Sequence, residues 1–472
     1  MVSTVTIRAE LESFIKKEGI TLHQFAERSG INVGTLSGII NGNRPISIGQ
    51  LDVITDVMGL PVGSFYEMYA DEGFASKAAP HWRRLRPFLL RCAELRRHDC
   101  IQKTLELLIE DIKQVAGIFE TAEIMFEQGL IESAILLYEC VIESERSSHS
   151  ERLAISYFRL FQIYQKDRHK GFTAAVQFLP YRHRLPEALV LDGLVMLIDL
   201  FAVNEKWDEA EDYADELCHI AYKLYENKIW KDPNFNPSRP LVYYYGRGYL
   251  SKAGAYEYRR MYAESRVWIS KYEDLSWFEG LDEAGNLEVE RYKMFAEANL
   301  LSIDIKEGNR SRISEYIAFL EENPSEVLEG LTTLLESANR HKFFVDEYLN
   351  RFAEEIKYYS KVTQKGWGNQ KNNQVSYNDS YHTFRCAIFF QKYAIYCFRK
   401  KIVDDGIENI LNSLRFSNKI NSKSTISNNM ILFEFFRHYS TEEQKSTYLK
   451  LCEEAWDYEE ELNLGECANS LG

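Results

Sequence analysis

The sequence predicts an all-helical protein in which a small N-terminal domain precedes a long array of helix pairs. Its 472 residues include only 10 prolines, and leucine, glutamate, alanine and lysine dominate long stretches, which favours helix. Hydrophobic residues make up 45% and charged residues 27% of the chain, the ordinary balance of a globular protein. Because the chain is too long for one ordinary core, we expect two or more domains or a repeat array.

The composition also indicates a compartment. The sequence has no run of about 18 uncharged apolar residues, and its first residues, "MVSTVTIRAELESFIKKEG", lack the apolar segment of a signal peptide. The eight cysteines form no C-x-x-C pair, so neither a zinc site nor a redox pair is indicated. We therefore expect a cytoplasmic protein with no membrane partner, no metal and no cofactor.

Apolar spacing and capping residues predict five short helices between residues 7 and 69. The stretch "IRAELESFIKKE" (7–18) places its apolar residues on one face and ends at Gly19. Thr21 and Gln24 form a capping-box pattern at the start of "LHQFAERSG". Asn32 is an N-cap for "VGTLSGII" (33–40). A fourth helix follows over 47–58, and "GLPVGSFYEMY" holds a short fifth.

This pattern resembles the XRE family of Cro/C1-type helix-turn-helix regulators over about residues 8–69. The positions that fall on the family pattern are Thr21, Phe25, Ala26, Gly30, Ile31, Ser37, Ile39, Asn41, Gly42, Pro45 and Leu60. Ile40 departs from the pattern, because the family usually has glutamate there. The resemblance implies a DNA-binding domain over residues 1–70, with its third helix in the major groove of an operator.

The resemblance also implies which residues contact DNA. The residues expected to face the DNA are Asn32, Val33, Gly34, Thr35 and Ser37. The residues expected to reach phosphates are Gln24, Asn41, Asn43 and Arg44. Since the third helix has no arginine, lysine or glutamine, we expect few direct base contacts and a large contribution from DNA shape. The alternative is a helix-turn-helix that serves as a protein-docking module.

Residues 71–116 are predicted to be a basic linker and connecting helix. Between residues 77 and 98 there are seven lysines and arginines and one acidic residue, Glu94. The basic side chains could contact phosphates, pair with the acidic remainder of the chain or be solvated, and the sequence leaves these three possibilities open. The whole chain has a formal net charge of −15, so general polyanion binding is not expected.

A helix-pair pattern recurs through residues 117–472. It is clearest at 125–139, 200–215, 256–270, 303–317 and 396–410, and weaker copies occur at 170–179 and 337–349. Small residues twelve positions apart, as in Ala253 and Ser265, mark where the two helices of a pair should touch. The pattern resembles degenerate tetratricopeptide (TPR) repeats, which implies a right-handed superhelix with a concave inner face.

The first helix of each pair is expected to supply the concave face. Amide and charged groups mixed with aromatic rings suit an extended peptide, because amides pair with its backbone and pockets hold its side chains. The candidate peptide-binding residues are Asp199, Arg247, Tyr258, Gln391 and Arg399. Arg247 and Arg399 are expected to hold the peptide's carboxylate terminus, and the acidic surplus of this region favours a neutral or basic peptide. Each residue could equally be an ordinary solvated side chain.

Together, the two halves resemble the Rap/Rgg/NprR/PlcR/PrgX group of peptide-pheromone receptors of Gram-positive bacteria. The resemblance implies a quorum-sensing transcription regulator whose TPR-like domain binds a short signalling peptide. It also implies a homodimer on a two-part operator. We expect the dimer to form through residues after about 340, where Phe389, Phe390, Tyr393, Tyr396 and Phe398 provide more aromatic surface than one helix pair can bury.

Two other classes of function were weighed. The sequence contains none of the phosphate-loop, zinc-protease, serine-hydrolase or dinucleotide-binding motifs, so we expect no enzyme activity. A TPR-like scaffold that binds or sequesters another regulatory protein, with the helix-turn-helix as a docking or weak DNA-binding module, stays open as the alternative.

Overall fold

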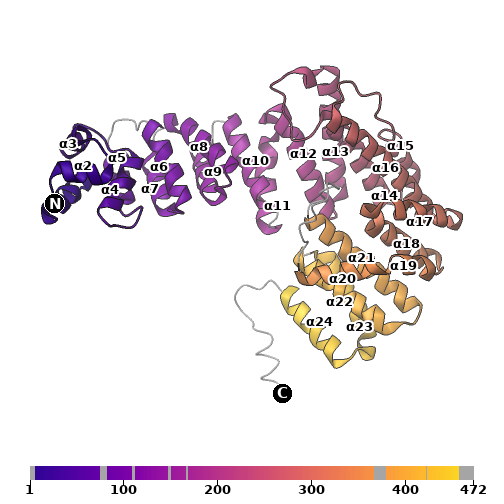
Figure 1. Ribbon diagram of the computed structural model, residues 1–472. Helices are drawn as coiled ribbons and strands as arrows, with labels where there is room; N and C mark the ends of the chain where they lie inside the picture. The colour runs from indigo at the N-terminus through magenta and orange to yellow at the C-terminus, as the bar shows by residue number, and fades with distance from the viewer. Residues whose placement is uncertain are drawn as a thin grey trace. The chain divides into compact units, whose positions relative to one another are not determined.

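The computed structural model describes residues 6–74, 82–108, 112–146, 150–165, 168–365, 379–420 and 422–455. All regular structure in these ranges is helical, as the sequence predicts. The chain divides into two compact units, residues 1–186 and 187–472 (Figure 1). The domain boundaries expected near residues 70 and 116 both lie inside the first unit. Lys77 and Cys467 lie outside the described residues.

The helices of the first unit begin with a five-helix head and continue as successive pairs. They are α1 (Ile7–Lys17), α2 (Leu22–Ser29), α3 (Val33–Ile40), α4 (Ile48–Val57), α5 (Tyr66–Phe74), α6 (Trp82–Glu94), α7 (His98–Leu108), α8 (Val115–Glu127), α9 (Ile131–Glu145), α10 (Glu151–Tyr164) and α11 (Arg168–Phe178). Short 3-10 helices are η1 (Ile112–Gln114) and η2 (Leu179–Arg184).

The second unit continues with longer helices. They are α12 (Glu187–Val203), α13 (Trp207–Glu226), α14 (Leu241–Tyr258), α15 (Tyr262–Ile269), α16 (Glu283–Lys306), α17 (Ile313–Glu322), α18 (Val327–His341), α19 (Asp346–Arg351), α20 (Ala353–Lys365), α21 (Asp379–Arg399), α22 (Val403–Lys419), α23 (Lys423–Phe436) and α24 (Glu442–Ala455). Its 3-10 helices are η3 (Ile229–Lys231), η4 (Arg310–Arg312), η5 (Pro324–Glu326) and η6 (Arg437–Tyr439).

The head helices start and stop where the capping residues predict. The Thr21 hydroxyl accepts from the Gln24 backbone N–H at 3.2 Å, and the Gln24 side-chain oxygen accepts from the Thr21 N–H at 2.8 Å, which confirms the capping box. Gly30 ends α2 with a left-handed φ of 66°, a conformation that glycine adopts without strain. A second capping box, between Ser47 and Gln50, opens α4.

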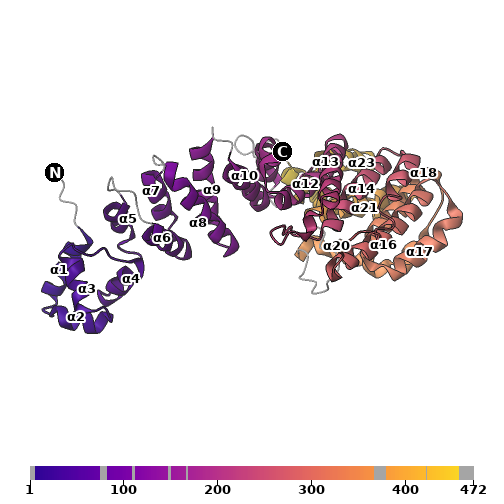
Figure 2. The ribbon, with the colours of Figure 1, turned by 90° about the horizontal axis from the view of Figure 1, so that it is seen from above.

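The core of the head continues without a break into α6. Tyr66 and Tyr69 of α5 pack their rings on Phe88 of α6, with centroids 5.6 and 5.1 Å apart, and all three side chains are buried. One hydrophobic cluster extends from Ile7 to Leu160. In Figure 2, α5 lies beside α7, and its Glu72 carboxylate also accepts from the Ile7 N–H at the start of α1 at 2.6 Å. The segment predicted as a linker therefore contains packed helices that share the core of the head.

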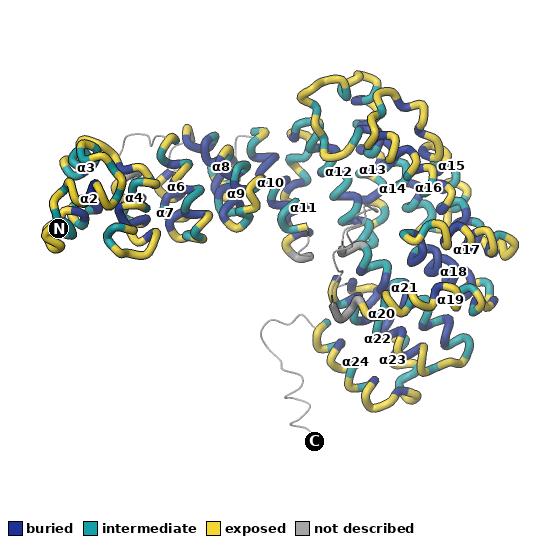
Figure 3. The backbone as a smooth tube through the Cα atoms, viewed as in Figure 1, coloured by how far each residue is buried: buried dark blue, intermediate teal, exposed yellow. Residues whose placement is uncertain are grey.

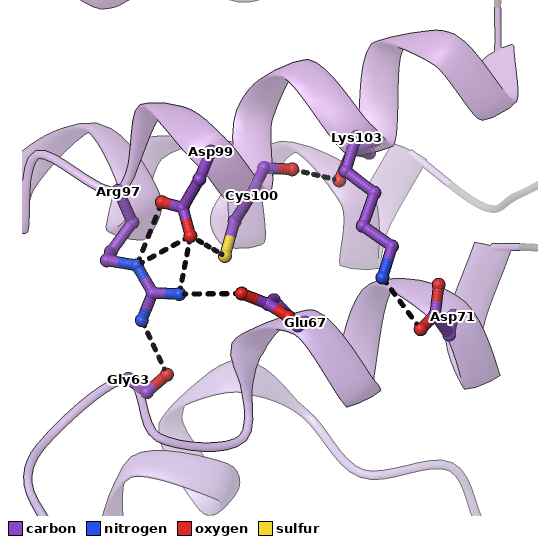
Figure 4. A network of polar contacts seen from close by, with 8 residues as sticks. Gly63, Glu67, Asp71, Arg97, Asp99, Cys100 and Lys103 are labelled. Atoms are coloured by element: carbon purple, nitrogen blue, oxygen red, sulfur yellow. Dashed lines mark hydrogen bonds and ion pairs between the residues drawn. The ribbon is translucent and has the colours of Figure 1, made fainter. Parts of the chain in front are cut away.

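Polar contacts reinforce the same junction (Figure 4). Arg97, at the start of α7, donates to the Gly63 carbonyl at 2.9 Å and lies 3.6 Å from the Glu67 carboxylate. Its hydrogen bond to Asp99 holds the pKa of that carboxyl down to about 2. Lys103 bonds Asp71 at 2.8 Å. These contacts join the turn before α5, and α5 itself, to α7.

Arginines of the basic segment 77–98 pair with acidic groups of the first unit. Arg91 bonds Asp52 of α4 at 2.9 Å, and Asp52 also accepts from the Tyr66 hydroxyl at 2.7 Å. Arg86 pairs with Glu120 of α8. Of the three possibilities that the sequence leaves open, internal pairing therefore holds for Arg86, Arg91 and Arg97.

Consecutive helices also pack in pairs in the second unit, as in α12 with α13, α14 with α15, and α21 with α22. The predicted small-residue contact between Ala253 and Ser265 is present: the buried Ser265 hydroxyl donates to the Ala253 carbonyl at 2.9 Å. Helix α18 is buried along most of its length (Figure 3). The first and last parts of this unit also meet, because the Ser424 hydroxyl donates to Glu205 at 2.7 Å and α12 contacts α21.

Three of the five aromatic residues named in α21 are covered within the chain. Phe389, Phe390 and Tyr396 are buried in the core of the second unit. Tyr393 and Phe398 are half-buried, and Phe398 stacks on Phe436 at 3.7 Å between ring centroids. The expected surplus of aromatic surface was therefore wrong for Phe389, Phe390 and Tyr396, because helices such as α18 and α22 pack on α21 within the same chain.

We expect Phe88→Ala to destabilise the head as well as α6. The substitution removes a fully buried ring and costs about 3–5 kcal/mol. Because the core is continuous, amide exchange should accelerate in α4 and α5 as well as in α6. Leu107→Ala on α7, a side chain 39% exposed, is the control and should change stability by about 0.5 kcal/mol or less. Unchanged protection in α4 and α5 would show that the head folds independently.

Candidate nucleic-acid interface and cavity

Helix α3 has one face in the head core and one face outside it. Leu36 and Ile39 are buried against the core, while Val33, Thr35 and Ser37 are half-buried on other sides of the helix. Because α3 is short, its start depends on a cap: the Asn32 side-chain oxygen accepts from the Gly34 N–H at 2.8 Å, as predicted.

The turn after α3 contacts the outer face of that helix. The Asn41 amide donates to the Ser37 hydroxyl at 3.2 Å, and an Arg44 guanidinium nitrogen donates to the Thr35 hydroxyl at 3.1 Å. Asn43 is exposed. The structure thus places Asn41 beside Ser37 and Arg44 beside Thr35, at two separate points on α3.

Gln24 lies at the start of α2 and is partly committed to the fold. Its side-chain oxygen accepts from the Thr21 backbone in the capping box, so its amide nitrogen is the group left for a phosphate. The sequence analysis missed Arg8, which lies on α1. A Cβ atom built on Gly42 would lie 2.5 Å from the Arg8 guanidinium, because α1 packs against α3. Only tertiary packing brings these residues together.

The second unit encloses a cavity of about 770 Å³. Its lining comes mainly from α12, α14, α16, α18 and α21, with residues of α23 at one side. Four of the five predicted peptide-binding residues line it: Asp199, Arg247, Tyr258 and Gln391. Arg399 is not among the lining residues, and its guanidinium donates to the Ala338 carbonyl at the end of α18 at 2.6 Å.

The lining residues are held in place by partners. Arg247 pairs with Asp199 across α14 and α12. Tyr258, 54% exposed, stacks on Trp207 with ring centroids 4.5 Å apart. The Gln391 amide donates to Asn429 at 3.1 Å. Since these groups are already ordered, the entropic cost of ordering them around a ligand is reduced.

Two ion pairs in the cavity wall, formed by partly buried side chains, were missed at the level of sequence. Lys306 lies 2.6 Å from Glu257; burial disfavours its charge, but the attraction of Glu257 prevails and the pKa of the ammonium is raised. Arg385 pairs with Glu329, and this attraction overcomes burial and lowers the pKa of the carboxyl. A lysine within an apolar helical stretch, "LLSIDIK", is the one sequence signal that could have indicated the first pair.

The charge of the cavity differs from the charge of the chain. Acidic and basic side chains are equal in number in the lining. The acidic ones are Asp199, Glu205, Glu257, Glu326, Glu329 and Glu336, and the basic ones are Arg247, Arg259, Arg260, Lys306, Arg385 and Lys392. The acidic surplus of the whole chain therefore gives no guide to the charge of a ligand at this site.

The described residues contain no group of three or more histidines, cysteines, aspartates or glutamates placed to hold a metal ion. None of the helices in the same ranges has the length and apolar character needed to cross a membrane.

Comparison with known families identifies the head. Residues 11–65 match the model of a helix-turn-helix family of the XRE type. Comparison of the chain with curated proteins and with solved structures gives no match. The matched range covers α1 to α4 and the turn that follows them. The chain thus carries a helix-turn-helix domain of the kind found in DNA-binding regulators.

We expect Asn32→Ala to loosen α3. Loss of the side-chain cap should lower the free energy of opening of α3 by about 1 kcal/mol, measured by hydrogen exchange of its amides in the full chain. Asn43→Ala is the matched control, because Asn43 is exposed and forms no side-chain hydrogen bond among the described residues. Equal effects in the two variants would contradict the capping role.

Proposed function

We propose that the protein is a cytoplasmic transcription regulator that binds an operator through its head and a short linear peptide through its second unit. The head carries the first part of the proposal through the family match at residues 11–65 and the outward polar face of α3. The cavity of about 770 Å³ supports the second part, because it falls within the size range of ligand sites and has an amphipathic lining.

The chemistry of the lining favours a peptide over other ligands. An amide group such as that of Asn299 can pair with a peptide backbone, while Tyr258 and Phe295 offer aromatic surface for side chains. The helix pairs that form the wall agree with the TPR-like resemblance. A binding role rather than a catalytic one is part of the proposal, because the partly buried charges of the wall are paired with one another.

On DNA, the proposal assigns base contacts to α3 and phosphate contacts to its surroundings. Ser37 and Thr35 offer hydroxyls, and Val33 offers a methyl surface for thymine. Gln24 lies at the start of α2 and Asn41 directly after the end of α3, and both offer side-chain amide N–H groups to phosphates. Since these are few and mostly uncharged groups, one head binds weakly, and two heads in a dimer gain affinity through their effective concentration.

Peptide binding in the cavity affects DNA binding by the head only if the peptide has different affinities for the operator-bound and the operator-free protein. A peptide changes operator affinity by its differential affinity for the operator-bound and free forms. A hundredfold change corresponds to about 2.7 kcal/mol of coupling. The test is the operator dissociation constant with and without peptides secreted by the native culture. Micromolar peptide binding that leaves this constant unchanged would favour the scaffold alternative.

We expect Tyr258→Ala to weaken peptide binding, because the stacked ring offers apolar surface inside the cavity. The measurement is the peptide-induced rise in melting temperature of the full chain, which should fall by more than half. Tyr222→Ala is a matched control, since Tyr222 is 50% exposed but does not line the cavity. An equal response in both variants would place the peptide elsewhere.

We propose that the dimer forms through a surface of α23 and η6 rather than through α21. Ile431 and Phe435 of α23 and Tyr439 of η6 are spaced four residues apart and are 55%, 71% and 61% exposed. Such a row of large apolar side chains on adjacent turns is suited to burial against a second copy. It lies after residue 340, in the region where the sequence predicts the dimer.

We expect light scattering to give a mass near twice 55.1 kDa at tens of micromolar. Phe435→Asp should shift the protein to monomer, because a charge in the centre of an apolar contact is not compensated. Phe344→Asp, at a ring that is 59% exposed on another part of the second unit, should leave the mass unchanged. A monomeric wild-type chain at this concentration would refute the dimer.

A further inference from the structure

Helix α3, the proposed DNA-recognition helix, contains a glycine at a position where the backbone conformation does not require one. Gly38 lies in the middle of α3 with ordinary helical geometry, where glycine is a poor helix former. A Cβ atom built there would lie 3.2 Å from Cβ and 3.9 Å from Cδ of Arg44. The first contact is tighter than most Cβ contacts, so the stem of Arg44 would have to move by a few tenths of an ångström. The absence of a side chain at Gly38 therefore makes room for the stem of Arg44.

Arg44 is fixed to α3 at both ends of its side chain. Its backbone N–H donates to the Gly38 carbonyl at 2.9 Å, and so does the N–H of Asn43. Its guanidinium then donates to the Thr35 hydroxyl at 3.1 Å. Thr35 and Gly38 are three residues apart, so they are neighbours on one side of the helix. The side chain of Arg44 thus lies across the surface of α3.

This position leaves most of the guanidinium available. Arginine has five N–H donors in a planar fork, and the structure engages Arg44 with Thr35 while giving it no carboxylate partner among the described residues. Helix α3 itself, "VGTLSGII", has no charged residue. A bidentate contact of arginine with guanine O6 and N7 is the commonest specific contact in the major groove.

We propose that Arg44 contacts a guanine in the major groove from the face of α3, and that Gly38 and Thr35 position it. The inference rests on the proposed DNA-binding function and changes the role expected from sequence, which was a phosphate contact. Arg8 supplies a cation beside the Asn41–Gly42 turn instead; it has no ionic partner among the described residues.

The test is selection of DNA sequences from a random duplex library by the full-length protein and its variants, together with the salt dependence of binding to the selected duplex. The wild-type motif should contain a guanine in each half-site. Arg44→Ala should lose about tenfold or more of the discrimination for that guanine. Arg44→Lys should not restore it, since lysine lacks the planar fork.

Gly38 and Thr35 are the residues proposed to position Arg44. Substitutions at these residues should change the guanine preference, which a purely structural role would not affect. Gly38→Ala favours helix, so α3 should stay folded by circular dichroism, but the guanine preference should fall because Arg44 is displaced. Thr35→Ser keeps the hydroxyl and should retain the preference, whereas Thr35→Val should reduce it. Arg8→Ala is the matched arginine control: it should weaken binding to all sequences and lower the salt slope by about one, with the motif unchanged.

The inference is overturned if Arg44→Ala keeps the wild-type motif and loses only affinity and about one unit of salt slope, since that result defines a phosphate contact. It is also overturned if Gly38→Ala leaves the guanine preference intact. If the wild-type chain enriches no sequence at all, the proposed DNA-binding function fails together with the inference, so the two failures are distinguishable.

Discussion

Each short helix of the first unit depends on a neighbour to cover its apolar face, and the contact at Phe88 shows the consequence most clearly. Its ring lies between Tyr66 and Tyr69 of the head. Helices of about ten residues are marginal alone, so α5 owes its stability to this packing. The polar contacts of Arg91 and Arg97 then attach the same helices at their edges. The head and α6–α7 consequently form one folded body.

Arginines after the head bear on how an acidic chain could act as a DNA-binding regulator, as we propose. Arg86 and Arg91 pair with Glu120 of α8 and Asp52 of α4, so part of the positive charge of this segment is neutralised within the first unit. In the head, the Arg44 side chain lies across α3, and Arg8 lies beside the turn that follows this helix. Under the proposed function, the placement of these two cations, rather than net charge, would provide the contacts to DNA.

In the cavity of the second unit, as in the first unit, acidic and basic side chains pair with one another. Ion pairs such as Lys306 with Glu257 are partly buried in its wall, where either partner alone would carry a large desolvation cost. Pairing makes the wall nearly neutral, and hydroxyls, amides and rings lie between the pairs. The proposed peptide would therefore be recognised by shape and hydrogen bonding more than by its total charge.

The sequence by itself determined the helical class and the boundaries of the head helices. These features depend on local rules, namely apolar spacing, the caps at Thr21 and Asn32, and the left-handed turn at Gly30. Helix pairing at Ala253 and Ser265 was predictable for the same reason, because the two residues are joined by one short turn.

The remaining features were decided by the tertiary structure alone, because they depend on contacts between residues that are far apart in the chain. Arg8 reaches Gly42 only because α1 packs on α3, and Arg399 is turned to the end of α18 instead of the cavity. Phe389, Phe390 and Tyr396 of α21 looked like surplus surface because sequence does not show that helices such as α18 and α22 pack on α21. Burial is a property of the neighbours that a residue acquires on folding, and periodicity along one helix cannot specify those neighbours.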